Sequence, residues 1–453
     1  MLRCGNLWME THTSGHGPLV TVTRRHNGES FAAMQNENAD VVVVGAGVVG
    51  LATALALLER GRSVRVVDAG TVGCGSSHGN CGTLTPSHAL PLAAPGQVGR
   101  AMRWMLTPDA PLYLKPRFDP ALWSWLLRFA GRCNHAAMMR SGVARAALLQ
   151  ASRAAFPAWL ARHGIDCEFS ETGTDHVFRD PRALEAYRAE LAALAELGIR
   201  SEVIDGAAYE REEPAVRPGV AGTVRFPGDA SLRPDRYVSG LANAVRAAGG
   251  AIDEHREVTA IETGRDGAVQ VATTAGTVAG RDVVLAVGAW SPRLARRLDV
   301  PFLARAMQPG KGYSITYDRP ALAPRRPLTL QERSVCASTW GSGYRLGSTM
   351  EFSGFDTSLN RRRLDALERA AREYLHDGVG PVRREEWFGW RPMTVDDVPL
   401  LGPVPGRARQ WLATGHGMLG VSMSIATAEL VADLVCGRAP ALDPAPYRPE
   451  RLA

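Results

Sequence analysis

The sequence contains few cysteines, and their spacing carries no motif. There are seven among 453 residues, an odd number spread along the whole chain. Neither a Cys-x-x-Cys pair nor a Cys/His ligand spacing occurs, so the pattern predicts neither a disulfide framework nor a metal site. Such cysteine usage is typical of a reducing compartment, and we predict a cytoplasmic protein without a metal.

Long runs of one charge and uninterrupted apolar runs are also missing. The net charge of +6 comes mostly from scattered arginines, which argues against nucleic-acid binding but leaves peripheral contact with an anionic inner membrane open. The apolar stretch 41–58 is interrupted by Gly45, Gly47 and Gly50, so we predict no transmembrane helix there. Residues 1–38 lack the apolar core of a signal peptide and are predicted to be a disordered extension.

The rest of the composition is that of an ordinary globular protein. Hydrophobic residues make up 45% and charged residues 22% of the chain. Because 453 residues exceed what one hydrophobic core usually organises, we expect two domains.

The segment from Asp40 to Asp68 predicts a β-α-β unit that binds a dinucleotide. A β-branched run leads through Gly45-Ala46-Gly47-Val48-Val49-Gly50 into an Ala/Leu-rich helix, and a second β-branched run ends at Asp68. The three glycines suit a tight turn, close approach of a pyrophosphate and close helix packing, and the helix N-terminus favours the phosphates. Asp68 stands where a carboxylate can accept hydrogen bonds from ribose hydroxyls. The alternative is a parallel sheet whose glycines serve packing only.

Residues 73–82, with the sequence GCGSSHGNCG, favour FAD over NAD. They offer hydroxyls, an amide and exposed backbone, which suit a loop that lies along a diphosphate and a flavin ring. The alternative is an ordinary turn-rich loop. The candidate cofactor contacts here are Gly75, Ser76, Ser77, Asn80, Cys81 and Gly82.

Four separated blocks resemble the D-amino-acid oxidase superfamily of FAD enzymes, and within it the bacterial D-amino-acid dehydrogenases and the related hydroxyproline dehydrogenases. The blocks are the β-α-β unit, the loop SSHGNCG with TPSHALPLAAPG, the strand DVVLAVGAWSPRL, and the C-terminal pair GWRPMTVDDVPLLGP and ATGHGMLGVSMSIATAELVADLV. They bracket residues 40–440. The resemblance implies an α/β fold, with an FAD-binding Rossmann-like domain of the glutathione-reductase type and a second α+β substrate domain.

Both domains are then expected in several pieces of the chain. The FAD-binding domain takes residues 39–90, 225–300 and 386–440, and the substrate domain takes residues 91–224 and 301–385.

The residue patterns predict the elements that frame these domains. We expect a buried strand ending at Gly288, a short strand within 409–415, a helix over 422–435 and a helix over 359–375. Residues 254–280 alternate with period two, which predicts a small antiparallel layer over the sheet. Four tryptophans on helical stripes are expected in the core or at the domain interface, namely Trp104, Trp123, Trp125 and Trp159.

The resemblance also implies cofactor contacts from later parts of the chain. Val258 is expected beside the adenine, and Gly415-His416-Gly417 beside the flavin. The helix that follows is expected to point at the O2 side of the ring, where its dipole stabilises negative charge. The further candidates are Ala69, Leu84, Ala286, Gly288, Trp290, Gly389, Arg391, Met418, Leu419 and Gly420.

Amine oxidation asks the protein mainly to position the substrate, since the flavin supplies the chemistry. A substrate carboxylate is best anchored by an Arg, whose fork pairs bidentately, supported by a Tyr hydroxyl. Arg391 in GWRPMT is our first candidate, and its alternative role is an ion pair with Asp396 or Asp397. Tyr313 is expected on a strand that faces the flavin, with buried packing as its alternative.

Three further positions are candidates for the same site. Tyr344 and Arg345 are neighbours, so in a strand they point to opposite faces and only one can line the site. His88 follows the flavin loop and either contacts substrate or caps the next segment. His416 is expected to pack against the flavin rather than to abstract protons.

The leading hypothesis is an FAD-dependent D-amino-acid dehydrogenase that transfers a hydride from the substrate α-carbon to flavin N5 and passes electrons to a quinone or to O2. The alternatives are a D-proline or D-hydroxyproline dehydrogenase, a sarcosine- or glycine-type oxidase, and a non-catalytic FAD-holding subunit. Thr339 stands near a place where many similar dehydrogenases have an Arg, which leaves the choice between amino and cyclic imino acids open.

Overall fold

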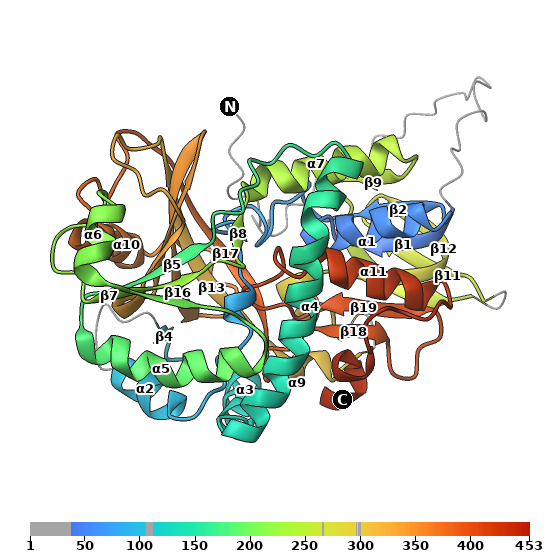
Figure 1. Cartoon of the computed structure of the whole chain (residues 1–453). Helices are drawn as coiled ribbons and strands as arrows, with labels where there is room; N and C mark the ends of the chain where they lie inside the picture. Colours follow the sequence, from blue (N-terminus) through green and yellow to red (C-terminus); the bar gives the residue numbers. More distant parts are fainter. Residues whose placement is uncertain (1–37, 106–111, 265–266, 296, 298–299) are drawn as a thin grey trace, which may run out of the picture.

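The computed structural model describes residues 38–453 except 106–111, 265–266, 296 and 298–299. The predicted disordered extension therefore falls almost entirely outside the described residues. Two mixed sheets lie side by side, and the long helix α4 (His135–Arg162) runs past the junction between them (Figure 1). Among the described helices, none combines the length and apolarity that crossing a bilayer requires.

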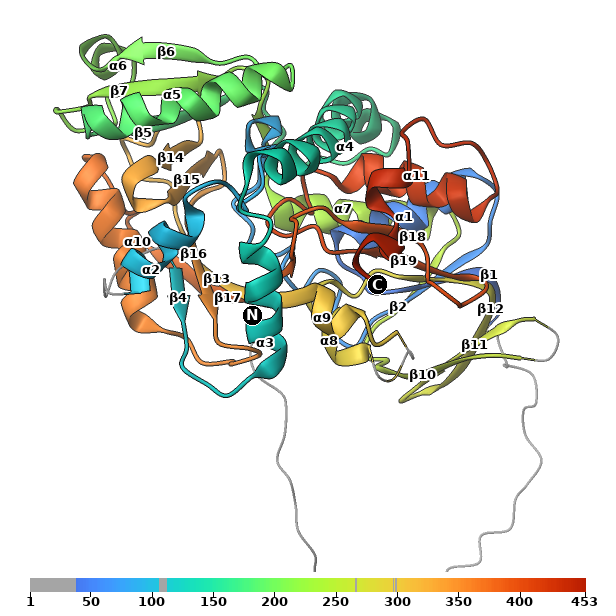
Figure 2. The ribbon, with the colours of Figure 1, turned by 90° about the horizontal axis from the view of Figure 1, so that it is seen from below.

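The first sheet carries the β-α-β unit. Its strand order is β10-β11-β12-β1-β2-β9, with β19 paired to β12 and β18 paired to β19. β1 runs parallel to β2 and β12. Its valines 41–44 are buried because both faces of the sheet are covered: helices α1, α7 and α11 pack on one face, and an apolar cluster that includes residues of β10–β12 packs on the other (Figures 1 and 2). The strands are β1 (Ala39–Val44), β2 (Val64–Val67), β9 (Ala251–Asp253), β10 (Val258–Thr263), β11 (Val269–Thr273), β12 (Gly276–Leu285), β18 (Leu400–Pro403) and β19 (Gln410–Thr414). The helices are α1 (Val48–Glu59), α7 (Pro234–Ala247) and α11 (Ser424–Val435).

The second sheet is mostly antiparallel. Its strand order is β17-β13-β16-β15-β14-β5-β7-β6, and β4 pairs with β16. The strands are β4 (Leu112–Leu114), β5 (Thr174–Phe178), β6 (Glu202–Asp205), β7 (Gly222–Phe226), β13 (Met307–Tyr317), β14 (Leu328–Leu330), β15 (Val335–Trp340), β16 (Gly343–Phe352) and β17 (Arg383–Thr394). A short pair, β3 (Thr83–Leu84) with β8 (Ala230–Ser231), joins the segments between the sheets.

The remaining helices surround the second sheet and the lower side of the molecule (Figure 1). They are α2 (Gln97–Met105), α3 (Pro120–Ala130), α5 (Pro181–Glu196), α6 (Gly206–Glu212), α8 (Ser291–Leu294), α9 (Leu303–Ala306) and α10 (Arg361–Tyr374). Short 3₁₀ turns are η1 (Pro86–His88), η2 (Gly288–Trp290), η3 (Gln331–Arg333), η4 (Ala445–Tyr447) and η5 (Pro449–Leu452).

Most elements expected from the sequence form where the patterns place them, but three features differ. Strands β10 and β11 extend the first sheet through β12 instead of forming a separate layer over it. The expected domain limit at residue 386 falls inside β17, which pairs along nearly all of β13 in the second sheet. Helix α4, expected in the substrate domain, packs on α11, where Ser152 accepts a hydrogen bond from the Ala426 amide at 2.9 Å.

Candidate active site

One cavity of about 2090 Å³ is lined by residues of both sheets. Ordinary ligand sites measure roughly 300–1,000 Å³, so this cavity has room for a dinucleotide together with a small substrate. Most of the residues predicted to bind the cofactor line it. Those predicted residues that do not line it are Ala46, Gly50, Gly82, Leu84 and Gly415.

The phosphate end of the cavity is built by glycines packed against backbone. Gly45 has φ +111, and a Cβ added to it would lie 2.5 Å from the Ala286 carbonyl oxygen at the end of β12. A Cβ on Gly50 would lie 1.9 Å from the Gly45 carbonyl oxygen, so Gly50 serves packing instead of facing the cavity. The Val48 amide at the start of α1 donates to Ser77 Oγ at 3.1 Å. This cradle of backbone amides fits the diphosphate of FAD.

The carboxylate of Asp68 supports the same loop. Oδ2 accepts from the Ala46 amide at 2.6 Å and Oδ1 accepts from the Gly70 amide at 2.7 Å. Burial raises the pKa of Asp68 above its ordinary value, and the two amide bonds oppose that rise. Asp68 lines the cavity, so it remains our candidate for the ribose, with loop support as a second role.

The loop 75–82 is held by the second sheet. Ser76 Oγ donates to the Trp390 carbonyl of β17, and His78 pairs with Glu385 at 2.8 Å. The guanidinium of Arg345 donates from Nη1 to the carbonyls of His78 and Asn80 at 2.8 and 2.7 Å. Arg345 is fully buried and does not line the cavity. The prediction of Arg345 as a candidate for the substrate site is therefore wrong, because its donors hold the loop.

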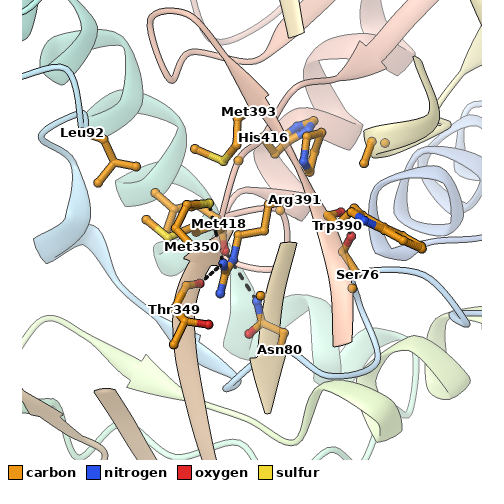
Figure 3. A pocket seen from close by; sticks show the side chains of 18 of the residues that line it. Ser76, Asn80, Leu92, Thr349, Met350, Trp390, Arg391, Met393, His416 and Met418 are labelled. Atoms are coloured by element: carbon orange, nitrogen blue, oxygen red, sulfur yellow. Dashed lines mark hydrogen bonds between the residues drawn. The ribbon is translucent and has the colours of Figure 1, made fainter. Parts of the chain in front are cut away.

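Arg391 projects from β17 into the cavity, near Asn80, Thr349 and Met350 (Figure 3). Its Nη1 donates to the Thr349 carbonyl at 2.6 Å. The guanidinium lies flat over Gly312 of β13, where an added Cβ would come within 2.4 Å of it. Only a glycine at 312 leaves room for this position.

No carboxylate in the described part of the chain pairs with Arg391. Asp396 pairs with Arg451 at 3.0 Å, and Asp397 lies 3.8 Å from Arg145 and accepts from the Leu92 amide at 2.6 Å. The alternative role of Arg391 as a partner of these two carboxylates is therefore wrong. Burial lowers the pKa of Arg391 to about 10, so the group is still cationic at neutral pH.

The two candidate tyrosines are placed differently. Tyr313 lines the cavity, but its hydroxyl donates to Glu351 at 3.1 Å. Tyr344 points to the other face of β16, where it packs with Tyr317 and Leu364 and donates to the Gly378 carbonyl at 3.4 Å. The prediction of a catalytic role for Tyr344 is wrong, because its ring is buried in the apolar cluster under α10 and does not line the cavity.

Both candidate histidines line the cavity and are neutral at neutral pH. Burial, with the charge of Arg145, lowers the pKa of His88 to about 4. Burial lowers the pKa of His416 to about 3, and its Nε2 shares a hydrogen bond with Thr427 Oγ1 at 3.0 Å. Neither imidazole offers a positive charge to a substrate carboxylate, whereas Arg391 does.

Sequence reasoning missed Thr349 and Met350, which complete the surroundings of Arg391. Thr349 has φ +64, at a bulge where the pairing of β13 with β16 shifts register. A β-branched residue is rarely found in this conformation, so no local pattern could have placed its carbonyl under the guanidinium. Met350, Met393 and Met418 surround the same group with apolar side chains (Figure 3).

Comparisons with known proteins give matches over most of the chain. A family model described as FAD dependent oxidoreductase (DAO) matches residues 40–434. The D-amino acid dehydrogenase of Paramagnetospirillum magneticum is 36% identical over 411 residues, covering 89% of this chain and 96% of the relative. The protein of the same name from Methylobacterium nodulans is 34% identical over 410 residues, with 88% and 96% covered.

Solved structures share the fold. Glycine oxidase from Geobacillus kaustophilus superposes with a TM-score of 0.73 at 24% identity, covering 92% of this chain and 98% of its own. L-proline dehydrogenase from P. horikoshii gives a TM-score of 0.66 at 17% identity, with 92% and 98% covered. Both likenesses concern the fold alone.

Proposed function

Because this chain belongs to the DAO family of FAD-dependent oxidoreductases, we propose that it oxidises D-amino acids to imino acids. Its cofactor is FAD, and the glycines that line the cavity at Gly45 and Gly47 leave room for the diphosphate. The observation that carries the substrate class is Arg391, a half-buried cation that lines the cavity and has no carboxylate partner among the described residues. The name of the two bacterial relatives supports the same substrate class.

In this proposal the protein binds and orients the amino acid. FAD, when bound, supplies the hydride acceptor N5 for the substrate α-hydrogen. Arg391 pairs with the substrate carboxylate, while the Thr349 carbonyl holds its Nη1 and Gly312 leaves room beneath it. The methionines around the guanidinium exclude water, which strengthens the ion pair. No side-chain base is needed, because loss of hydride from a neutral amine leaves an iminium that water hydrolyses.

A panel of amines mixed anaerobically with the protein tests this proposal. We expect D-amino acids to bleach the flavin absorbance, and their L-enantiomers to leave it unchanged. D-Proline, D-hydroxyproline, sarcosine and glycine belong in the panel, because they represent the two alternative substrate classes. If none of the D-amino acids bleaches the flavin, the proposal fails; bleaching by sarcosine and glycine alone favours the N-substituted amine oxidase.

Peripheral contact with an anionic membrane is part of the proposal. Elements α2, β4 and α3 lie on one side of the molecule (Figures 1 and 2). Apolar side chains on this side are Met102, Phe118, Trp123 and Leu127, with exposed fractions of 60, 96, 58 and 74%. Burial and the neighbouring charges of Arg132 and Arg305 lower the pKa of Arg128 here, which marks a basic cluster next to the apolar side chains. Apolar side chains beside basic ones suit an anionic lipid surface.

Flotation with lipid vesicles measures this contact. We expect the protein to float with phosphatidylglycerol vesicles and to remain in solution with phosphatidylcholine vesicles. A triple change of Phe118, Trp123 and Leu127 to Ser is expected to reduce flotation about tenfold, since each buried apolar group contributes to binding. Val143 and Val203, exposed by 59 and 50%, provide the control when both are changed to Ser. If the Val143/Val203 variant loses as much flotation as the triple variant, the surface around α3 is not the site of membrane contact.

A further inference from the structure

Four aromatic side chains form a connected cluster beside the active site, made of Trp290, Phe355, Trp390 and Phe388. Trp290 stacks on Phe355 with ring centroids 4.7 Å apart and an interplanar angle of 16°. Trp390 lies edge-on to Trp290 at 5.4 Å and to Phe388 at 5.3 Å. All four line the cavity, and Trp290 is 39% exposed. The cluster therefore extends from the flavin loop to the protein surface.

Arg293 adds a positive charge to this cluster. Its guanidinium carbon lies 3.9 Å from the Phe355 ring centroid and 5.2 Å from that of Trp290. Within the described ranges no carboxylate pairs with it, and loss of water lowers its pKa below the ordinary value. An unpaired cation over aromatic rings is a site that favours a planar ligand carrying electron-rich oxygens.

The cluster is also tied to the region of the flavin. Trp390 immediately precedes Arg391, and its carbonyl accepts the hydroxyl hydrogen of Ser76 (Figure 3). Trp290 follows Gly288 at the end of β12, beside the phosphate cradle. A ligand held on the cluster is therefore close to the cofactor without occupying the place of the amino acid at Arg391.

We propose that Trp290, Phe355 and Arg293 form the docking site of the electron acceptor, a planar quinone. This rests on the proposed function, because an amino-acid oxidation must deliver its electrons to an acceptor. The quinone takes up the two electrons and the one proton that the substrate hydride delivered to the cofactor. It takes a second proton from solvent and becomes the quinol, while water hydrolyses the iminium that the substrate has become. The quinone ring stacks on the Trp290 indole, which is 39% exposed, and on the half-buried ring of Phe355. Arg293 donates to a carbonyl oxygen of the quinone and stabilises the charge that develops there.

Binding of menadione, a soluble naphthoquinone, to the oxidised holoprotein tests the site without any turnover. Calorimetry on the wild type is compared with Phe355→Ala and Arg293→Glu, which remove the stacking face and the cation. We expect each change to weaken binding about tenfold, given the usual strength of aromatic stacking and cation–π contacts. The controls are Val203→Ala, whose side chain is 50% exposed on β6, and Arg188→Glu on the surface of α5.

A second measurement separates this site from the amino-acid site. The cofactor is reduced with dithionite, excess reductant is removed anaerobically, and reoxidation by menadione is followed. We expect Phe355→Ala and Arg293→Glu to slow reoxidation about tenfold while FAD content and anaerobic bleaching by D-amino acids stay at the wild-type level. Because no amino acid is used in the reoxidation step, its result does not depend on the proposed substrate.

Two outcomes would overturn the proposal. One is wild-type menadione binding and reoxidation in both variants. The other is loss of FAD from Phe355→Ala or Arg293→Glu, which would assign the cluster to the cofactor site instead.

Discussion

Replacing Arg391 by methionine is expected to lower kcat/KM for a D-amino acid about a thousandfold, while FAD stays bound. The expectation follows from the geometry of Arg391, which is half-buried and faces the cavity. Its guanidinium has no carboxylate partner among the described residues, so we expect the substrate carboxylate to be that partner and to bury the pair when it binds. Truncating one member of a buried charge pair costs about 2–5 kcal/mol, and a thousandfold corresponds to about 4 kcal/mol. Steady-state kinetics on the best substrate of the panel measures the loss.

An amine without a carboxylate separates anchoring from general damage at the site. For such a substrate the wild type and Arg391→Met are expected to have equal kcat/KM, because no ion pair is lost. Arg391→Lys is expected to recover only part of the activity, since an ammonium cannot make the paired bonds of the guanidinium fork. Arg188→Met on exposed α5 is the surface control. If Arg391→Met slows both substrates equally, the residue acts on the cofactor or on folding and the anchoring role is wrong.

Gly312 offers an independent way to move the same group. An added Cβ at 312 would lie 2.4 Å from the Arg391 guanidinium, so Gly312→Ala displaces the cation without removing it. We expect the same selective loss on carboxylate-bearing substrates, smaller than in Arg391→Met. If Gly312→Ala and Arg391→Met both slow only the substrates that carry a carboxylate, the loss comes from the position of the guanidinium and not from a general effect on folding.

The phosphate cradle was predictable because its signal is local. The spacing of Gly45, Gly47 and Gly50 after a β-branched run fixes a strand, a turn and a helix within a short stretch, and the structure shows β1, α1 and β2 there. At Gly45 and Gly50 the atom nearest to an added Cβ is a backbone carbonyl oxygen, which explains why the chain needs glycine at both positions. Local spacing is sufficient to predict a structural element when the residues that pack together in it are near each other in sequence.

The substrate side was less predictable, because it depends on register between distant strands. Period two correctly separates Tyr344 from Arg345, but it does not tell which face meets the flavin loop. That is decided by α10, which packs on the Tyr344 side, and by carbonyls of His78 and Asn80 far away in the chain. The domain boundary predicted at residue 386 differs from the structure for a similar reason. Only the pairing with β13 shows that one strand, β17, continues past this residue through Arg391.

Amphipathic spacing also overstates burial on helix α3. Trp125 and Trp159 are buried as expected, with 2 and 3% of their surface exposed, whereas Trp123 is 58% exposed on the same helix as Trp125. Trp123 and Trp125 are two positions apart, so they cannot share one helical face. The sequence alone shows that one of them must leave the core, but it does not show which.

Gly50→Ala is expected to reduce the affinity for FAD about a hundredfold. The new Cβ would stand 1.9 Å from the Gly45 carbonyl oxygen. Gly45 is held in place by the hydrogen bond that its amide donates to the Val67 carbonyl at 2.8 Å. Helix α1 must therefore move outward, which carries its N-terminal amides away from the phosphates. Overpacking of this kind costs about 1–3 kcal/mol, and the upper end corresponds to the hundredfold loss. Titration of the stripped protein with FAD, followed by flavin fluorescence, measures it.

Two further variants separate cofactor binding from folding. Gly228→Ala meets no atom within 4 Å and should retain FAD as the wild type does. Gly47→Ala would place its Cβ 3.5 Å from Ser77 Oγ, an ordinary contact, yet on the cavity side where the pyrophosphate approaches. It should therefore weaken FAD binding while the stripped protein unfolds at the wild-type temperature. If Gly47→Ala and Gly50→Ala both bind FAD normally, the diphosphate is held elsewhere; if only the unfolding temperature falls, the glycines serve packing alone.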